Sequence, residues 1–113
     1  MVVVLFRSRL TAIAGDDYSQ MAAEMLSTAQ HMPGFIDFKS FRADDGERIS
    51  VIWWQDQETL AAWRNHTRHL IAQQAGRSKW YEYYKIEVAE VVRQATFLRR
   101  DELSPLEIGE SAF

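Results

Sequence analysis

Hydrophobic and polar residues along this chain follow two alternating periods. The apolar, β-branched run from Val2 to Phe6 becomes polar toward residue 10, which predicts a buried strand over 2–10. Turn-forming residues over 44–47 predict a hairpin between two further strands. These further strands and a last one are predicted over 35–42, 49–54 and 81–93.

The segments between the strands have the period of helices. Apolar residues recur at helical spacing from Tyr18 to Ala29, after a break and N-cap at 15–17 and before the helix breakers Pro33-Gly34. Asp56 caps a second helix, which we expect to run without interruption as far as Gly76. Its predicted inward stripe consists of Leu60, Trp63, Thr67, Leu70, Ile71 and Gln74.

The order strand, helix, strand, strand, helix, strand predicts an α+β fold of the ferredoxin-like βαββαβ type. A four-stranded antiparallel sheet then carries both helices on one face. The strands are apolar on both faces, as Trp53 and Trp54 illustrate. An uncovered apolar face predicts a homodimer joined through the sheet faces. The alternative is a monomer that covers this face with its own tail.

Length and composition narrow the possible functions. We interpret residues 1–93 as one domain and residues 94–113 as a C-terminal arm or tail, either lying on a neighbouring subunit or disordered. A net charge of −3 argues against nucleic acid and against an anionic membrane surface as partners. The chain lacks cysteine, a stretch long enough to cross a membrane and the features of a signal peptide, so we expect a cytoplasmic protein.

The candidate catalytic residues lie on the predicted second helix. Trp63 is at the centre of the inward stripe, with His66 about 60° and His69 about 120° away around the helix. A histidine on this side of the helix can act as a base or proton shuttle near neutral pH. Trp63 can equally be core alone, and the two histidines can be idle. His66 and His69 would hold a metal only with a third ligand, so no metal site is predicted.

Aromatic residues suggest a pocket beside these side chains. The predicted pocket residues are Phe6, Trp53, Leu70, Trp80 and Tyr84. The run over 80–84 is explained equally well by packing at the start of the last strand. Arg64, Arg68 and Arg77 suit either an anion or a solvated helix face. There is no Gly-rich phosphate loop, G-x-S-x-G motif or dinucleotide fingerprint, so neither a flavin nor a nicotinamide cofactor is indicated.

Several short motifs together resemble one family over about residues 1–93. They are Pro33-Gly34-Phe35, the strand 49–54, the spaced positions Glu58, Trp63, His69, Gln73, Gly76-Arg77, Trp80-Tyr81 and Tyr84, and the final Val88-Ala89-Glu90-Val91. The combination is similar to the antibiotic biosynthesis monooxygenase (ABM) domain. This resemblance implies a dimeric α/β barrel, in which two ferredoxin-like subunits are joined sheet to sheet.

The resemblance implies three functions. Quinone-forming, cofactor-free oxygenases of the family place a Trp on the second helix and a Tyr six residues later; here Trp63 is followed by His69. The first hypothesis is thus a cofactor-independent monooxygenase that uses O₂ on a small phenolic or hydroquinone-like substrate, with His69 or His66 as base. The second is a non-catalytic small-molecule-binding or stress-related dimer. The third is haem binding or degradation, although the first strand has no Asn and position 73 is Gln rather than His.

Overall fold

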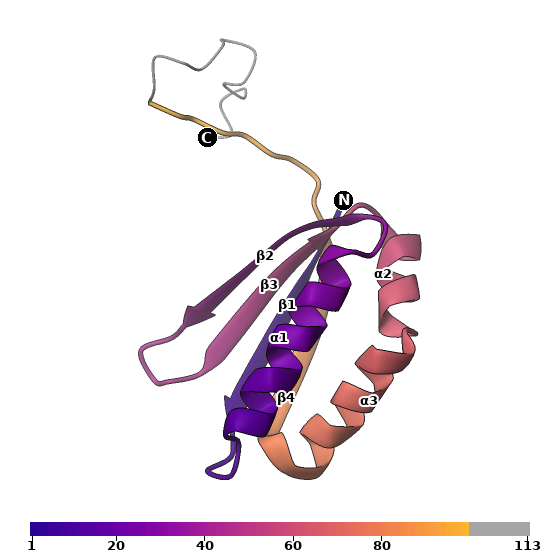
Figure 1. Ribbon diagram of the computed structural model, residues 1–113. Helices are drawn as coiled ribbons and strands as arrows, with labels where there is room; N and C mark the ends of the chain where they lie inside the picture. Colours follow the sequence, from indigo (N-terminus) through magenta and orange to yellow (C-terminus); the bar gives the residue numbers. More distant parts are fainter. Residues whose placement is uncertain (100–113) are drawn as a thin grey trace.

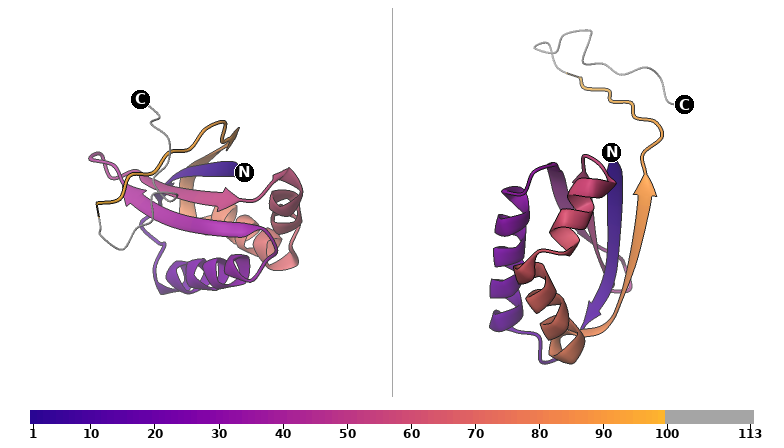
Figure 2. Two further views of the ribbon diagram at one scale, coloured as in Figure 1. Left: turned by 90° about the horizontal axis from the view of Figure 1, so that it is seen from above. Right: turned by 90° about the vertical axis from the view of Figure 1, so that its right-hand side faces the viewer.

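The computed structural model describes residues 1–99 and confirms the predicted fold class (Figure 1). One antiparallel sheet has the strand order β2-β3-β1-β4, and the helices cover one of its faces as a second layer (Figure 2). The elements in chain order are β1 (Val2–Leu10), α1 (Asp16–Gln30), β2 (Phe35–Arg42), β3 (Arg48–Trp54), α2 (Gln57–Arg64), α3 (Thr67–Ala75), the π-helix η1 (Gly76–Trp80) and β4 (Tyr81–Glu90).

The strand register decides which side chains face the helices. Val2 pairs with Trp54, and Val4 pairs with both Ile52 and Val88, so these side chains share the helix-side face. The core lies there, around Val2 and Trp54, each 1% exposed. Its other buried members are Val4, Ala29 and Leu60. This core joins β1 and β3 to α1 and α2.

The prediction of one continuous second helix is wrong. The helix ends at Arg64, and a new one begins at Thr67 after an extended residue, His66, with φ −65° and ψ 135°. His66 caps the new helix, because its Nδ1 accepts a hydrogen bond from the backbone N–H of Arg68 at 3.1 Å. The break thus replaces one long amphipathic helix with two short ones that have separate orientations.

The predicted inward stripe is therefore correct only as far as Trp63. On α3, the predicted inward residues Thr67, Leu70, Ile71 and Gln74 are exposed. The half-buried positions are instead His69, Ala72, Gln73 and Ala75, followed by the buried Gly76. Helix α3 has no buried residue of its own. The last strand also ends earlier than predicted, at Glu90 rather than residue 93.

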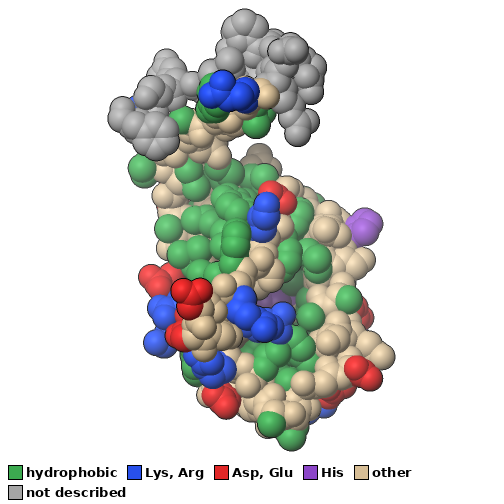
Figure 3. Space-filling model, turned by 90° about the vertical axis from the view of Figure 1, so that its left-hand side faces the viewer, with side chains coloured by type: hydrophobic (Ala, Val, Ile, Leu, Met, Phe, Trp, Pro, Cys, Tyr) green, Lys and Arg blue, Asp and Glu red, His purple; other side chains and the backbone are tan. Residues whose placement is uncertain are grey.

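The face of the sheet away from the helices is only partly apolar, which corrects the expectation that neither face is polar. Val3 pairs with Trp53, and Leu5 pairs with Val51. Farther along the same face, Glu47 accepts hydrogen bonds from Arg7 Nε at 2.7 Å and from Tyr83 Oη at 2.5 Å. Figure 3 views the molecule from the side opposite α2 and α3, where hydrophobic side chains gather above a group of charged ones.

The chain continues beyond β4 without helix or strand over residues 91–99. The Val91 N–H donates to the carbonyl of Met1 at 3.0 Å, while the side chain of Val92 is 95% exposed. Most of the predicted tail of 94–113 lies outside the described residues. No helix in the part of the chain up to residue 99 is long and apolar enough to cross a membrane.

Candidate active site

Trp63 lies between the core and two histidines. Its ring stacks on Trp54 at a centroid distance of 6.2 Å, with Trp54 belonging to the buried core. The centre of the His69 ring lies 4.8 Å from the centre of the Trp63 ring, and the centre of the His66 ring lies 5.8 Å from it. The structure therefore brings together the three residues that the sequence suggested as catalytic. It also shows that Trp63 is neither fully buried nor separate from the core.

His69 has the protonation state that a base requires. Its Nδ1 lies 3.2 Å from the backbone carbonyl of Arg64. A carbonyl can only accept, so Nδ1 carries the hydrogen and Nε2 retains a lone pair. Burial lowers the pKa of His69 below the ordinary 6.5, and the nearby His66 lowers it further, against an opposing effect of the Arg64 carbonyl. His69 is thus neutral at pH 7 and ready to accept a proton.

His66 has a different role. Its Nδ1 is the acceptor that caps α3, so this nitrogen is not free to take a proton while the cap is in place. The neutral ring then carries its hydrogen on Nε2, and protonation at Nδ1 would remove a cap of α3. Of the two candidate bases, the geometry favours His69.

A second cluster of aromatic side chains joins β1 and β4 to α1. Phe6 stacks on Tyr84 at 5.4 Å and meets Tyr81 edge-on at 5.5 Å. Tyr81 in turn meets Tyr18 edge-on at 5.9 Å. Burial, together with the phenol of Tyr18, raises the pKa of Tyr81 well above its usual value. Tyr81 therefore stays protonated and uncharged and does not act as a base.

The predicted pocket residues are divided by the fold. Phe6 and Tyr84 lie on the helix-side face, and Leu70 on α3 is 48% exposed. Trp80 is 4% exposed, and its Nε1 donates to Asp17 Oδ2 at 3.0 Å, so it fills space beside α1. Trp53 pairs with Val3 on the opposite face of the sheet and does not line the space beneath the helices.

Tyr81 and Gly76 were not identified as site residues from the sequence. The pairing of β1 with β4 shifts between Arg9 and Leu10, so that Leu10 pairs with Tyr81. This irregularity turns Tyr81 toward the helices, where Gly76 allows its close approach. A Cβ on Gly76 would lie 2.7 Å from the Tyr81 ring. The periodicity of the sequence predicts neither the register shift nor the close approach of Tyr81 to Gly76.

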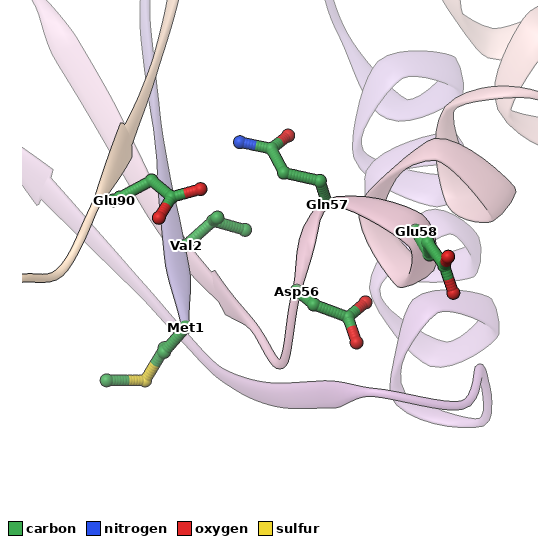
Figure 4. Close-up of a pocket in the computed structure, with 6 residues that line it drawn as sticks. All are labelled: Met1, Val2, Asp56, Gln57, Glu58 and Glu90. Carbon is green, nitrogen blue, oxygen red and sulfur yellow. The ribbon is translucent and has the colours of Figure 1, made fainter.

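Two hollows among residues 1–99 lie elsewhere. One, of about 430 Å³, is lined by Met1, Val2, Asp56, Gln57, Glu58 and Glu90. Its acids do not converge: in Figure 4 the carboxylates of Asp56 and Glu58 point away from Glu90. The other, of about 310 Å³, lies between α1 and η1. Across the described residues, no group of three potential metal ligands is found. Neither hollow includes Trp63 or His69.

Comparison with solved structures first defines the class of fold. SnoaB from Streptomyces nogalater, described as a cofactor-independent oxygenase, superposes with a TM-score of 0.69 at 15% identity, covering 82% of this chain and 94% of that one. Rv0793 from Mycobacterium tuberculosis gives a TM-score of 0.73 at 14% identity, covering 84% and 98%. At these identities the likeness is one of fold.

Sequence comparison then gives the family. A family model described as antibiotic biosynthesis monooxygenase matches residues 1–75. The uncharacterized protein YqjZ of Bacillus subtilis is 42% identical over 80 residues, which is 71% of this chain and 70% of that protein. The jasmonate monooxygenase ABM of Pyricularia oryzae is 30% identical over 94 residues, or 80% of this chain but only 43% of that protein. The chain belongs to the antibiotic biosynthesis monooxygenase family.

Proposed function

We propose that this protein is a cofactor-independent monooxygenase that oxidises a small phenolic or hydroquinone-like compound with O₂. The observation that carries the proposal is the Trp63–His69 pair, in which a neutral imidazole with a free Nε2 lies 4.8 Å from an indole ring. Family membership and the fold shared with a cofactor-independent oxygenase support the type of reaction. The proposed substrate class takes its support from the cluster of aromatic side chains formed by Phe6, Tyr81 and Tyr84 on the helix side of the sheet.

The proposed reaction starts with His69. Its Nε2 takes the proton of the substrate hydroxyl, giving an electron-rich anion. One electron then passes to O₂, and the resulting superoxide and substrate radical combine to form a peroxide at a ring carbon. Cleavage of the O–O bond and loss of the hydrogen on that carbon give a carbonyl and water. The products thus contain one oxygen atom of O₂ in the quinone and the other in water, and O₂ is the only oxidant.

The proposal includes a homodimer joined through the sheet face away from the helices. This face carries Val3, Leu5, Val51 and Trp53, and Phe41 on β2 is 50% exposed. Leaving such a patch in water forgoes about 25 cal/mol per Å² of apolar area. Sedimentation velocity at micromolar concentration is expected to show a particle of twice the 13.2 kDa chain mass. A stable particle of the single-chain mass would contradict the dimer.

The catalytic proposal is tested by oxygen uptake with a panel of hydroquinones. His69→Ala is expected to slow turnover by about 10²- to 10⁴-fold, the usual contribution of a positioned base. Trp63→Phe is expected to have a smaller effect, because an aromatic ring remains beside the base. His31→Ala is the matched control, since His31 also places Nδ1 against a backbone carbonyl, that of Ser27 at 2.7 Å, but lies exposed on the C-terminal side of α1.

Two outcomes would count against catalysis. Equal rates for the wild type and His69→Ala would remove the base from the mechanism. Ligand-induced thermal stabilisation without any oxygen uptake would instead support the non-catalytic binding protein, because a ligand at 100 times its dissociation constant adds about 2.7 kcal/mol to stability.

A further inference from the structure

We propose that Arg77 binds a carboxylate of the substrate, so that the preferred substrates are phenolic acids rather than neutral phenols. This inference rests on the proposed function, because it names the substrate class of the same site. It starts from the position of Arg77 in η1, directly after the helix that carries His69.

Arg77 is held toward the sheet by a neutral partner. Its Nε donates a hydrogen bond to Tyr84 Oη at 2.6 Å, and its guanidinium carbon lies 5.8 Å from the centre of the Tyr84 ring. Tyr84 belongs to the helix-side face, where it stacks on Phe6. The phenol orients the guanidinium without neutralising it, and only Nε is used.

The charge of Arg77 is not balanced by an acid in the part of the chain that the structure describes. Four other basic side chains there pair with carboxylates, namely Arg7, Arg9, Arg68 and Lys79. Arg77 is in none of these ion pairs, and its two terminal nitrogens have no acceptor among residues 1–99. Two parallel N–H groups of a guanidinium are the arrangement that a carboxylate binds in bidentate fashion.

The backbone that presents Arg77 is itself uncommon. Residues 76–80 form a π-helix, a conformation that is rare and is frequently found at functional sites. It places Gly76 against the Tyr81 ring and buries Trp80, while the Arg77 side chain reaches β4. Arg77 is itself exposed, so a ligand can reach its guanidinium from solvent while the bond to Tyr84 fixes its direction.

Exposed apolar side chains lie on the same two elements. Leu70 follows His69 on α3, and Ile86 and Val88 of β4 share the helix-side face with Tyr84; these three side chains are 48%, 47% and 42% exposed. His69 and Arg77 are eight residues apart, or about 12 Å along a helix axis. A ligand that reaches both therefore has its acid separated from the phenol ring by a short chain.

The experiment is calorimetric titration under nitrogen, so that binding is measured without turnover. The probes are hydroquinone propanoate, its methyl ester and hydroquinone carboxylate. The wild type is expected to bind the propanoate at least tenfold more tightly than the ester and also more tightly than the carboxylate, whose acid is on the ring. Arg77→Gln is expected to weaken the binding of the propanoate at least tenfold and to leave the affinity for the ester unchanged.

Two further variants sharpen the result. Tyr84→Phe removes the 2.6 Å hydrogen bond and is expected to lower the affinity for the propanoate by less than Arg77→Gln does. Arg42→Gln is the charge-matched control, because Arg42 lies exposed at the end of β2, and it is expected to leave both affinities as in the wild type. A structural role of Arg77 would change acid and ester binding together.

The inference is overturned if the wild type binds acid and ester equally, if it binds neither, or if Arg77→Gln weakens both to the same degree. These outcomes are distinct from failure of the proposed function. A protein that prefers the acid but consumes no oxygen would keep the carboxylate site and lose the monooxygenase. One that oxidises acid and ester at equal rates after binding them equally would keep the monooxygenase and lose the carboxylate site.

Discussion

The two ends of the helix layer are built differently, although they cover the same sheet. Under α1 and α2 the core is closed, with Val2 and Trp54 1% exposed and Leu60 6% exposed. Under α3 no residue of the helix is buried, and Ile86 and Val88 on the strand below remain more than 40% exposed. Leaving half of such a side chain in water forgoes roughly 1 kcal/mol. The closed end supplies stability, whereas the open end leaves apolar side chains in contact with solvent.

Trp63 and Arg68 join these two ends. Trp63 contacts the core through Trp54 and the open end through His69. Arg68, one residue before His69, is tied to α1 by an ion pair with Glu24. Helix α3 is therefore anchored on one flank to α1 and at its start to the core, which leaves the other flank open toward β4. His69 is thus positioned by packed elements while its neighbours stay accessible.

The largest expected effect comes from emptying the closed end. Trp54→Ala removes a fully buried aromatic side chain and is expected to lower the free energy of unfolding by about 3–5 kcal/mol. Leu70→Ala, a truncation at the open end, is expected to cost less than about 1 kcal/mol because Leu70 is 48% exposed. Urea denaturation of both variants measures the difference. Similar losses for the two would show that α3 packs as tightly as the core around Trp54.

An intermediate effect is expected where the open end meets the π-helix. Gly76→Ala places a Cβ 2.7 Å from the Tyr81 ring, so the ring or the helix must move, at about 1–3 kcal/mol. Gly15→Ala serves as the control, since a Cβ at position 15 meets nothing within 4 Å. Thermal unfolding compares the two variants. If Gly76→Ala is as stable as Gly15→Ala, the close approach of Tyr81 is not required.

The smallest effect concerns the pH dependence of the open end. The pKa of His69 is lowered in the folded state, so between pH 7 and that lowered pKa the unfolded chain binds more protons. Stability is therefore expected to fall as pH decreases below the ordinary 6.5, and His69→Gln is expected to flatten this fall. Chemical denaturation from pH 8 to pH 5 tests the sign. An identical pH profile in the variant would mean that His69 ionises as in the unfolded chain.

In the proposed mechanism, the rate of turnover also depends on the protonation state of His69. Because the base must be neutral, kcat/KM is expected to rise with pH through an apparent pKa below 6.5. The stability and activity profiles should then report the same residue, and His69→Gln should alter both.

Much of the fold was readable from local pattern. The strand period set the two faces of β3, and the register confirmed that Trp53 and Trp54 lie on opposite sides. The same alternation did not show that Trp53 faces away from the helices, because a period of two separates the faces without identifying them. The charged network of Arg7, Glu47 and Tyr83 was also missed, since its members come from three different strands or turns.

The sequence by itself determined the order of the strands and the fold class, because periodicity and turn residues act over a few positions and are written directly in the chain. Its short motifs also carried the resemblance to the family. The tertiary structure alone decided the break at His66, the inward turn of Tyr81 and the placement of Arg77 on Tyr84. Each of these depends on a competition between helix or strand continuation and a contact with another element. Such contacts are fixed only when α3, η1 and β4 meet in space.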